Sequence, residues 1–256
     1  MKKKNNLIFI TNDDGFNSNG FKVLGNICNK LFEEVQIFAP AFNQSAKSHS
    51  ITINNNLVLK KHGINQFSLI GTPTDCVIIG LHKLSKKNKL PKLLLSGVNE
   101  GANLGFDILY SGTVAAAREG SLNGIKSIAL SIDTIKNSVD WSGLEYYAPK
   151  IIKRIYKNKI PNDIFYNINF PNIPKSSIKG LKIVKLGKRK PGNVIIKNKG
   201  YYKIPSERKM LSSAKKGEDE FELRRNYITI SFHTYTNLSL ENKIFLKVKK
   251  DLGRVF

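Results

Sequence analysis

The sequence predicts a three-layer α/β fold built on a mostly parallel sheet, and two patterns predict it. Short runs rich in Ile, Val, Leu and Phe are typical of buried parallel strands, and they occur at 7–11, 34–40, 92–97, 127–132 and 165–170. Segments whose apolar residues recur at helical spacing alternate with these runs, at 20–32, 71–82, 113–123 and 143–156. Alternating strands and helices favour right-handed crossovers, so we expect a doubly wound, Rossmann-like sheet.

The C-terminal part of the chain has a different pattern. Short β-like pieces separated by basic loops predict antiparallel β-hairpin extensions at 181–186, 194–196, 201–204 and 227–232. A final short helix is expected at 241–252, and two further β-like segments, at 51–60 and 66–71, indicate another hairpin. We therefore expect a single domain over 1–256, with an α/β core at 1–179 and a hairpin arm at 180–256.

Composition limits the function classes. The chain has 256 residues and a formal net charge of +23, which would suit a nucleic-acid binder or an enzyme with anionic substrates. The lysines are spread along the chain, however, so no dedicated nucleic-acid partner is expected. No stretch approaches the ~20 apolar residues of a membrane span. Cys28 and Cys76 lack metal-ligand spacing and are expected to be reduced core thiols, so we expect a cytoplasmic protein without a membrane partner.

Two adjacent carboxylates end the first predicted strand. Asp13 and Asp14 follow the apolar run directly, and Gly15 permits the chain to turn there. Ligands of an open α/β sheet bind outside the carboxyl ends of its strands. Two like charges at that position are costly unless a cation neutralises them. The sequence therefore predicts a metal site, and a helix-capping pair is the structural alternative.

Neutral polar residues follow other strands at the same edge. Ser45 lies in the loop after 34–40, and Asn99 follows 92–97. Ligand sets made only of oxygen favour Mg²⁺ or Mn²⁺, or Ca²⁺, and two carboxylates leave such a site about neutral and able to accept a phosphate. Ser111, Gly112 and Thr113 open a helix whose backbone N–H groups can bind that phosphate. Taken singly, the serines, the threonine and the asparagine would be ordinary loop or cap residues.

An ordered set of motifs resembles the SurE (survival protein E) family. The motifs are Thr11-Asn12-Asp13-Asp14-Gly15, Asn43-Gln44-Ser45, Ser48-His49-Ser50, Gly71-Thr72-Pro73-Thr74-Asp75, Ser96-Gly97-Val98-Asn99, Gly101-Ala102-Asn103-Leu104-Gly105 and Tyr110-Ser111-Gly112-Thr113. The resemblance implies a metal-dependent phosphomonoesterase that hydrolyses nucleoside 5′- and 3′-monophosphates and, in some members, short polyphosphate. It also implies a cytoplasmic homodimer or homotetramer, often built from swapped C-terminal elements, so 180–256 would hold the oligomerisation elements.

The resemblance also assigns roles to residues. It implies one divalent cation per subunit held by Asp13, Asp14, Ser45 and Asn99. We expect Asp13 and Asp14 to be catalytic, with Asp13 the better candidate to hold or deprotonate the attacking water. We favour a position near the phosphate for Asn103, together with Ser111, Gly112 and Thr113. Three residues depart from the family pattern in loops near the site, where Asp, Gly and Asp are usual: Ala41, Ala46 and Phe106.

Rival functions fit the sequence less well. A dinucleotide-binding oxidoreductase needs G-x-G-x-x-G after the first strand, where this chain has Asn12-Asp13-Asp14-Gly15. A phosphate-accepting signalling receiver would have a third aspartate at a later strand end, where Asn99 stands. An RNA binder would rest on the net charge alone. His49 is a tempting proton donor, but a lone loop histidine is more often structural.

Overall fold

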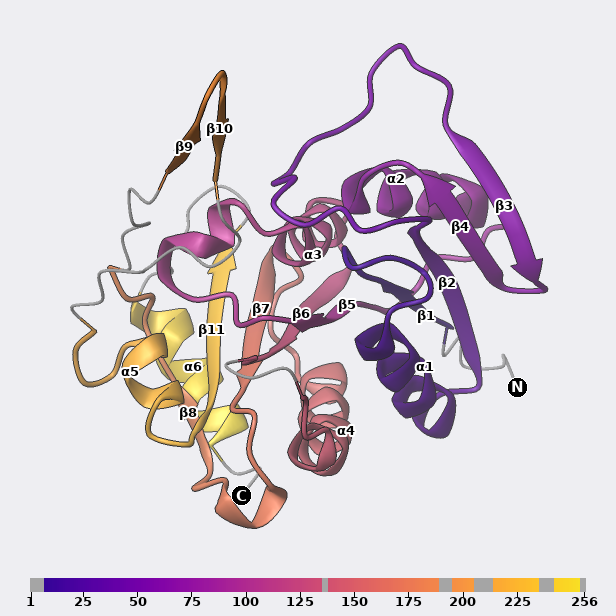
Figure 1. The fold of residues 1–256 in the computed structure, drawn as a ribbon. Helices are drawn as coiled ribbons and strands as arrows, with labels where there is room; N and C mark the ends of the chain where they lie inside the picture. Colours follow the sequence, from indigo (N-terminus) through magenta and orange to yellow (C-terminus); the bar gives the residue numbers. More distant parts are fainter. Residues whose placement is uncertain (1–6, 135–137, 189–194, 205–213, 235–241, 254–256) are drawn as a thin grey trace, which may run out of the picture.

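A nine-stranded sheet forms the centre of the molecule in a computed structural model that describes residues 7–134, 138–188, 195–204, 214–234 and 242–253 (Figure 1). Its strands lie in the order β3-β4-β2-β1-β5-β6-β7-β11-β8. In chain order, they are β1 (Leu7–Thr11), β2 (Glu34–Pro40), β3 (Val58–Gly63), β4 (Gln66–Ile70), β5 (Leu93–Glu100), β6 (Lys126–Ile132), β7 (Ile164–Phe170), β8 (Leu181–Ile183) and β11 (Ile228–Thr234). A separate antiparallel pair is formed by β9 (Ile196–Asn198) and β10 (Tyr201–Lys203).

The central part of the sheet is parallel, as the sequence predicts. Strands β4, β2, β1, β5, β6 and β7 all pair in parallel, so their carboxyl ends share one edge. Within the nine-stranded sheet, the described antiparallel pairs lie outside this block, between β3 and β4 and between β7 and β11. Strand β1 lies between β2 and β5 and is fully buried, because helices cover both faces of the sheet around it.

Helices cover the two faces as separate layers (Figure 1). The larger core packs α1 (Asn19–Leu31), α4 (Ser142–Lys157) and α6 (Asn242–Leu252) on one face. The other face carries α2 (Pro73–Ser85) and α3 (Gly112–Leu122). Short elements complete the fold: η1 (Gly105–Leu109), η2 (Lys175–Ser177) and α5 (Asp219–Leu223). None of the helices in the described ranges has the length and hydropathy needed to cross a bilayer.

The helix starts follow from local chemistry. Thr72 accepts a hydrogen bond from the backbone N–H of Asp75, and the Asp75 carboxylate accepts one from the backbone N–H of Thr72. This reciprocal capping box, with Pro73 in the first turn, begins α2. Ser111 caps α3 in a simpler way, because its hydroxyl accepts the backbone N–H of Val114. Both caps lie at the carboxyl edge of the parallel strands.

The observed elements differ from the predicted ones in detail. Residues 51–57 form no strand, and β3 begins only at Val58. The C-terminal part contains the antiparallel pair β9–β10, and β11 pairs antiparallel with β7. Strand β8, however, pairs in parallel with β11, and both strands belong to the central sheet. Helix α5 has no counterpart among the expected elements. The expected strand at 194–196 lies partly outside the described residues, and the antiparallel pair found there is β9–β10.

Candidate metal centre at the carboxyl edge of the sheet

Four segments meet beyond the carboxyl ends of β1, β2 and β5. They are the turn after β1 with Asp13 and Asp14, the loop after β2 with Ser45, the end of β5 with Asn99, and the first turn of α3. Hydrogen bonds join them: the backbone N–H of Gln44 donates to the Asp13 carbonyl at 2.7 Å. The fold therefore brings the sequence-predicted residues to one edge from four distant segments.

Asp13 is the buried centre of this group. Its side chain is 3% exposed, and its carboxylate accepts a hydrogen bond from the Thr113 hydroxyl in the first turn of α3. Gly112 allows this close approach, because a Cβ at that position would lie 2.9 Å from the Asp13 Cβ. The first turn of α3 is thus fitted directly against the first carboxylate.

Asp14 is half-buried and is held from two sides. The backbone N–H of Glu100 donates to one carboxylate oxygen at 3.2 Å, and the Asn43 side-chain amide lies 3.5 Å from the other. Gly15 adopts φ 101°, in the left-handed region that glycine tolerates, and a Cβ at this position would lie 3.1 Å from the backbone of Phe42 and 3.3 Å from that of Asn43. This turn presents both carboxylates to the same edge of the sheet.

The electrostatics of the pair favour a bound cation. Burial, together with the negative charge of Asp14, raises the pKa of Asp13 to about 7, and burial also raises the pKa of Asp14. Among the described residues, the groups that counteract these shifts are hydrogen-bond donors of Thr113, Asp13 and Glu100, and no basic side chain is one of them. Two uncompensated carboxylates side by side suit a divalent cation.

Neutral oxygens beside the carboxylates add to the donor set. Asn99 donates its side-chain N–H to the Gly101 carbonyl at 2.6 Å, which leaves the amide oxygen as the atom that can bind a cation. Ser45 is exposed, and its backbone N–H donates to Asn43 at 2.8 Å. The described residues contain no group of three or more His, Cys, Asp or Glu that could hold a metal ion. Two carboxylates with a hydroxyl and an amide oxygen fit a hard cation such as Mg²⁺ or Mn²⁺.

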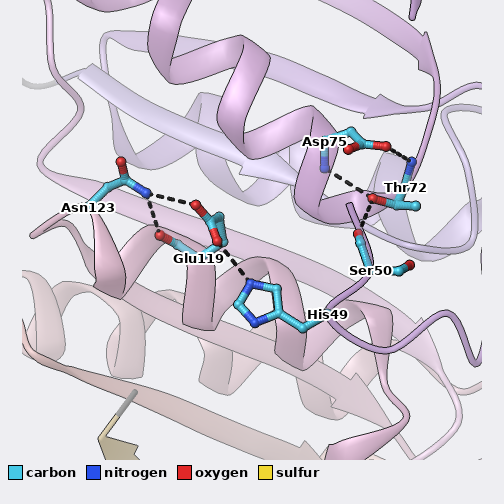
Figure 2. Close-up of polar contacts among 6 residues, drawn as sticks. All are labelled: His49, Ser50, Thr72, Asp75, Glu119 and Asn123. Carbon is cyan, nitrogen blue, oxygen red and sulfur yellow. Dashed lines mark hydrogen bonds and ion pairs between the residues drawn. The ribbon is translucent and has the colours of Figure 1, made fainter. Parts of the chain in front are cut away.

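The loop that carries Ser45 is anchored to α2 and α3, the two helices on one face of the sheet (Figure 2). His49 lies 2.9 Å from the Glu119 carboxylate on α3, and the Thr72 hydroxyl at the start of α2 donates to the Ser50 carbonyl at 2.7 Å. Farther along, the Thr52 hydroxyl donates to Asp75 at 2.6 Å. These contacts give His49 a structural role, which agrees with the reading that the sequence favours.

The predicted phosphate ligands fall into two groups. Ser111, Gly112 and Thr113 lie at the start of α3 beside Asp13, where the positive end of the helix dipole favours an anion. Several N–H groups there already have acceptors: that of Ser111 donates to the Asp107 carbonyl, that of Thr113 to the Asp13 carboxylate and that of Val114 to the Ser111 hydroxyl. Asn103 is buried instead, and its side chain donates to the Ser131 hydroxyl at 2.8 Å. Its carbonyl accepts hydrogen bonds from two side chains of β7, Asn167 and Asn169. These contacts anchor the loop after β5, while the phosphate role of Asn103 stays a prediction.

Sequence reasoning missed residues that support the site from outside it. Asp219 on α5 is 1% exposed and accepts the backbone N–H groups of Gly105 at 2.7 Å and Gly187 at 2.9 Å. It therefore ties the loop before α3 to the C-terminal part of the chain. No local pattern could reveal this link, because 114 residues separate Asp219 from Gly105. Asn43 and Glu100 were missed as well, although each adjoins a predicted ligand region.

Comparisons with known proteins identify the family. The sequence model described as "Survival protein SurE" matches residues 8–193. The chain belongs to the SurE family. It is 44% identical over 191 residues to a 5′-nucleotidase SurE of Paramagnetospirillum magneticum, covering 74% of this chain and 73% of the relative. A 5′-nucleotidase SurE of Rhodopseudomonas palustris is 37% identical over 235 residues, covering 88% and 91% of the two chains.

A solved structure supports the fold assignment independently. The crystal structure of the SurE protein from Aquifex aeolicus superimposes with a TM-score of 0.78 at 32% sequence identity, covering 95% of this chain and 98% of that one. One of the three residues that depart from the family pattern has an unusual backbone conformation. Ala46, where the SurE pattern usually has glycine, adopts φ 59°, a left-handed conformation that is strained for a residue with a Cβ.

Proposed function

We propose that this SurE family member is a 5′-nucleotidase, a divalent-metal-dependent phosphomonoesterase that hydrolyses nucleoside 5′-monophosphates to nucleoside and phosphate. The observation that carries the proposal is the pairing of Asp13 and Asp14 with the first turn of α3, because it sets a cation site beside an anion site. The relatives at 44% and 37% identity carry the name 5′-nucleotidase, which supports the same reaction.

Each side chain has a defined task in this proposal. Asp13, Asp14, Ser45 and Asn99 would hold the cation, which when bound supplies positive charge that offsets the carboxylates and polarises the phosphate ester. Asp13 holds the attacking water and accepts its proton, and the Thr113 hydroxyl fixes the orientation of the carboxylate. The positive end of the α3 dipole stabilises negative charge on the phosphate oxygens, and such positioning dominates phosphoryl transfer.

The proposal also covers further substrates, the assembly, the compartment and the cation. We include 3′-monophosphates and short polyphosphate among the substrates, a homodimer or homotetramer as the assembly, and the cytoplasm as the compartment. Their support is the resemblance of the motifs to the SurE family. Mg²⁺ and Mn²⁺ are the favoured cations, with Ca²⁺ also compatible with an all-oxygen donor set.

The test is phosphate release from AMP and GMP by the purified protein with Mg²⁺ or Mn²⁺. We expect turnover by the wild type and a loss of at least about a hundredfold in kcat for Asp13→Asn. Asp163→Asn is the matched control, because Asp163 is an exposed aspartate just before β7. Absence of phosphate release from a nucleotide panel would refute the proposal, and full activity of Asp13→Asn would refute the site.

A further inference from the structure

A pocket of about 280 Å³ is lined in part by the two segments that carry Asp14 and Ser45, the turn after β1 and the loop after β2. Its lining residues belong to the turn after β1, the end of β2 with the start of the following loop, and the β3–β4 hairpin. Figure 1 shows this hairpin at the edge of the sheet. Phe67 and Leu69 of β4 point into the core beneath α2, so Ser68 and Ile70 lie on the opposite face. The pocket therefore occupies the part of the sheet face beyond α1.

The pocket has an apolar and aromatic lining that is exposed to solvent. Phe42 is 68% exposed, and the paired strand residues Val58 and Ile70 are 57% and 55% exposed. On another side, the Phe16 ring stacks on the His62 ring, with centroids 4.2 Å apart and an angle of 22° between the planes. Flat aromatic surfaces around a shallow pocket are suited to a planar ring.

Two residues that line the pocket are close in the chain to predicted metal ligands. Phe16 follows Asp14 by two residues, and Phe42 precedes Ser45 by three. Consecutive Cα atoms are 3.8 Å apart, so these positions lie no more than about 8 Å and about 11 Å from the two predicted metal ligands. The ribose of a mononucleotide whose phosphate occupies the metal centre spans a gap of this size.

We propose that this pocket receives the nucleobase of the substrate, with Phe42 as the principal stacking residue. The inference rests on the proposed nucleotidase function and adds a specificity determinant to it. Asn17 and Lys60 line the same pocket and offer hydrogen-bond donors to the base edge. Because every base has a π-face, recognition dominated by stacking tolerates all four bases. The pocket thus distinguishes nucleotides from simple sugar phosphates more strongly than one base from another.

The test compares AMP with ribose 5-phosphate, which has the same phosphate and sugar but lacks the base. For Phe42→Ala, we expect KM for AMP to rise about tenfold, the effect of losing one stacking contact, while KM for ribose 5-phosphate stays unchanged. Phe42→Trp should retain the wild-type KM for AMP. Ile64→Ala is the matched control, because Ile64 is 89% exposed and is not part of the pocket lining.

The outcomes separate this inference from the proposed function. If the wild type cleaves AMP and Phe42→Ala leaves its KM unchanged, the pocket does not bind the base. Equal KM changes for both substrates would also overturn the inference, since they would indicate a disturbed metal centre. An unchanged KM with an altered sedimentation coefficient would identify the surface as a contact between copies of the chain. Failure of the wild type to cleave either substrate would refute the proposed function itself.

Discussion

The Thr113 hydroxyl donates a hydrogen bond to the buried carboxylate of Asp13, which joins the first turn of α3 to the end of β1. This bond favours the charged form of the carboxylate and lowers its pKa against the effect of burial. It also fixes one carboxylate oxygen. The relationship therefore controls both the charge and the orientation of the residue at the centre of the site.

Thr113→Val should weaken both cation binding and turnover. The substitution keeps the shape of the side chain but removes the donor, so a larger fraction of Asp13 is protonated at neutral pH. We expect kcat for AMP to fall about tenfold, the scale of one hydrogen bond to a charged group, and Mn²⁺ affinity to fall with it. Steady-state kinetics and calorimetric Mn²⁺ titration measure the two effects. Thr113→Ser should behave like the wild type, and wild-type values for Thr113→Val would exclude this role.

Asp13→Asn should stabilise the metal-free protein at alkaline pH. The folded-state pKa of Asp13 is about 7, above its ordinary value of 3.8, so the folded protein keeps a proton that the unfolded chain has lost. Stability from this group is complete below about pH 4 and is lost as pH rises to 7, a change of about 4 kcal/mol. In EDTA at pH 8, Tm should therefore be several degrees higher for Asp13→Asn than for the wild type, and the difference should vanish near pH 4.

Metal addition should reverse that order. Mg²⁺ or Mn²⁺ at pH 8 should raise Tm of the wild type through binding to the folded state, and should leave Asp13→Asn unchanged. Asp163→Asn serves as the control for loss of an exposed charge. A wild type that is more stable than Asp13→Asn in EDTA at every pH would contradict the electrostatic account of the site.

Gly112→Ala should impair activity although alanine favours helices. Its Cβ would lie 2.9 Å from the Asp13 Cβ and 3.0 Å from Pro73, so the first turn of α3 must shift. We expect kcat to fall at least about tenfold, because misplacement of catalytic groups by 1 Å is costly. Gly25→Ala is the control: Gly25 lies inside α1 with open space around it, so that variant should gain about 1 kcal/mol in stability and keep full activity. Equal activity of the two variants would contradict the close-packing argument.

Asp219→Ala should loosen the loop before α3. It leaves the buried N–H groups of Gly105, Gly187 and Glu220 without their acceptor. We expect a loss of about 2–4 kcal/mol in the free energy of unfolding, measured by urea denaturation, and a higher KM for AMP. Asp163→Ala should change neither quantity. A loss below about 0.5 kcal/mol would show that this carboxylate does not anchor the loop.

The sequence predicted the parallel part of the fold well because its signals are local. Strand β1 is apolar throughout and ends in Asp13-Asp14-Gly15, and α3 begins with a serine cap. The motifs at the strand ends converge because parallel strands share a carboxyl edge, so strand order predicted where the candidate site lies. The choice of Ser45 and Asn99 as ligands came from the resemblance to the SurE family. Asn99 is an exception in detail: it belongs to β5 rather than to the loop after it, because the strand continues beyond a register shift between Ser96 and Asn99.

The remainder depends on contacts between distant segments. Residues 51–57 look β-like, yet Thr52 bonds to Asp75 and the chain follows the surface towards α2 instead of pairing. Helix α5 contains three acidic residues and has no apolar periodicity. Its burial depends on the backbone N–H groups that Asp219 and Glu222 accept and on the ion pair between Glu222 and Lys182. The pairing of β8 with β11 likewise joins distant parts of the sequence, because Leu181 lies opposite Ile228, 47 residues later in the chain.

The most direct test of the central claim is phosphate release from AMP by the wild type before EDTA treatment, after it, and after Mn²⁺ is restored. The account predicts turnover in the first and third conditions and almost none in the second. Unchanged turnover after complete removal of divalent cations would contradict a metal centre at Asp13 and Asp14.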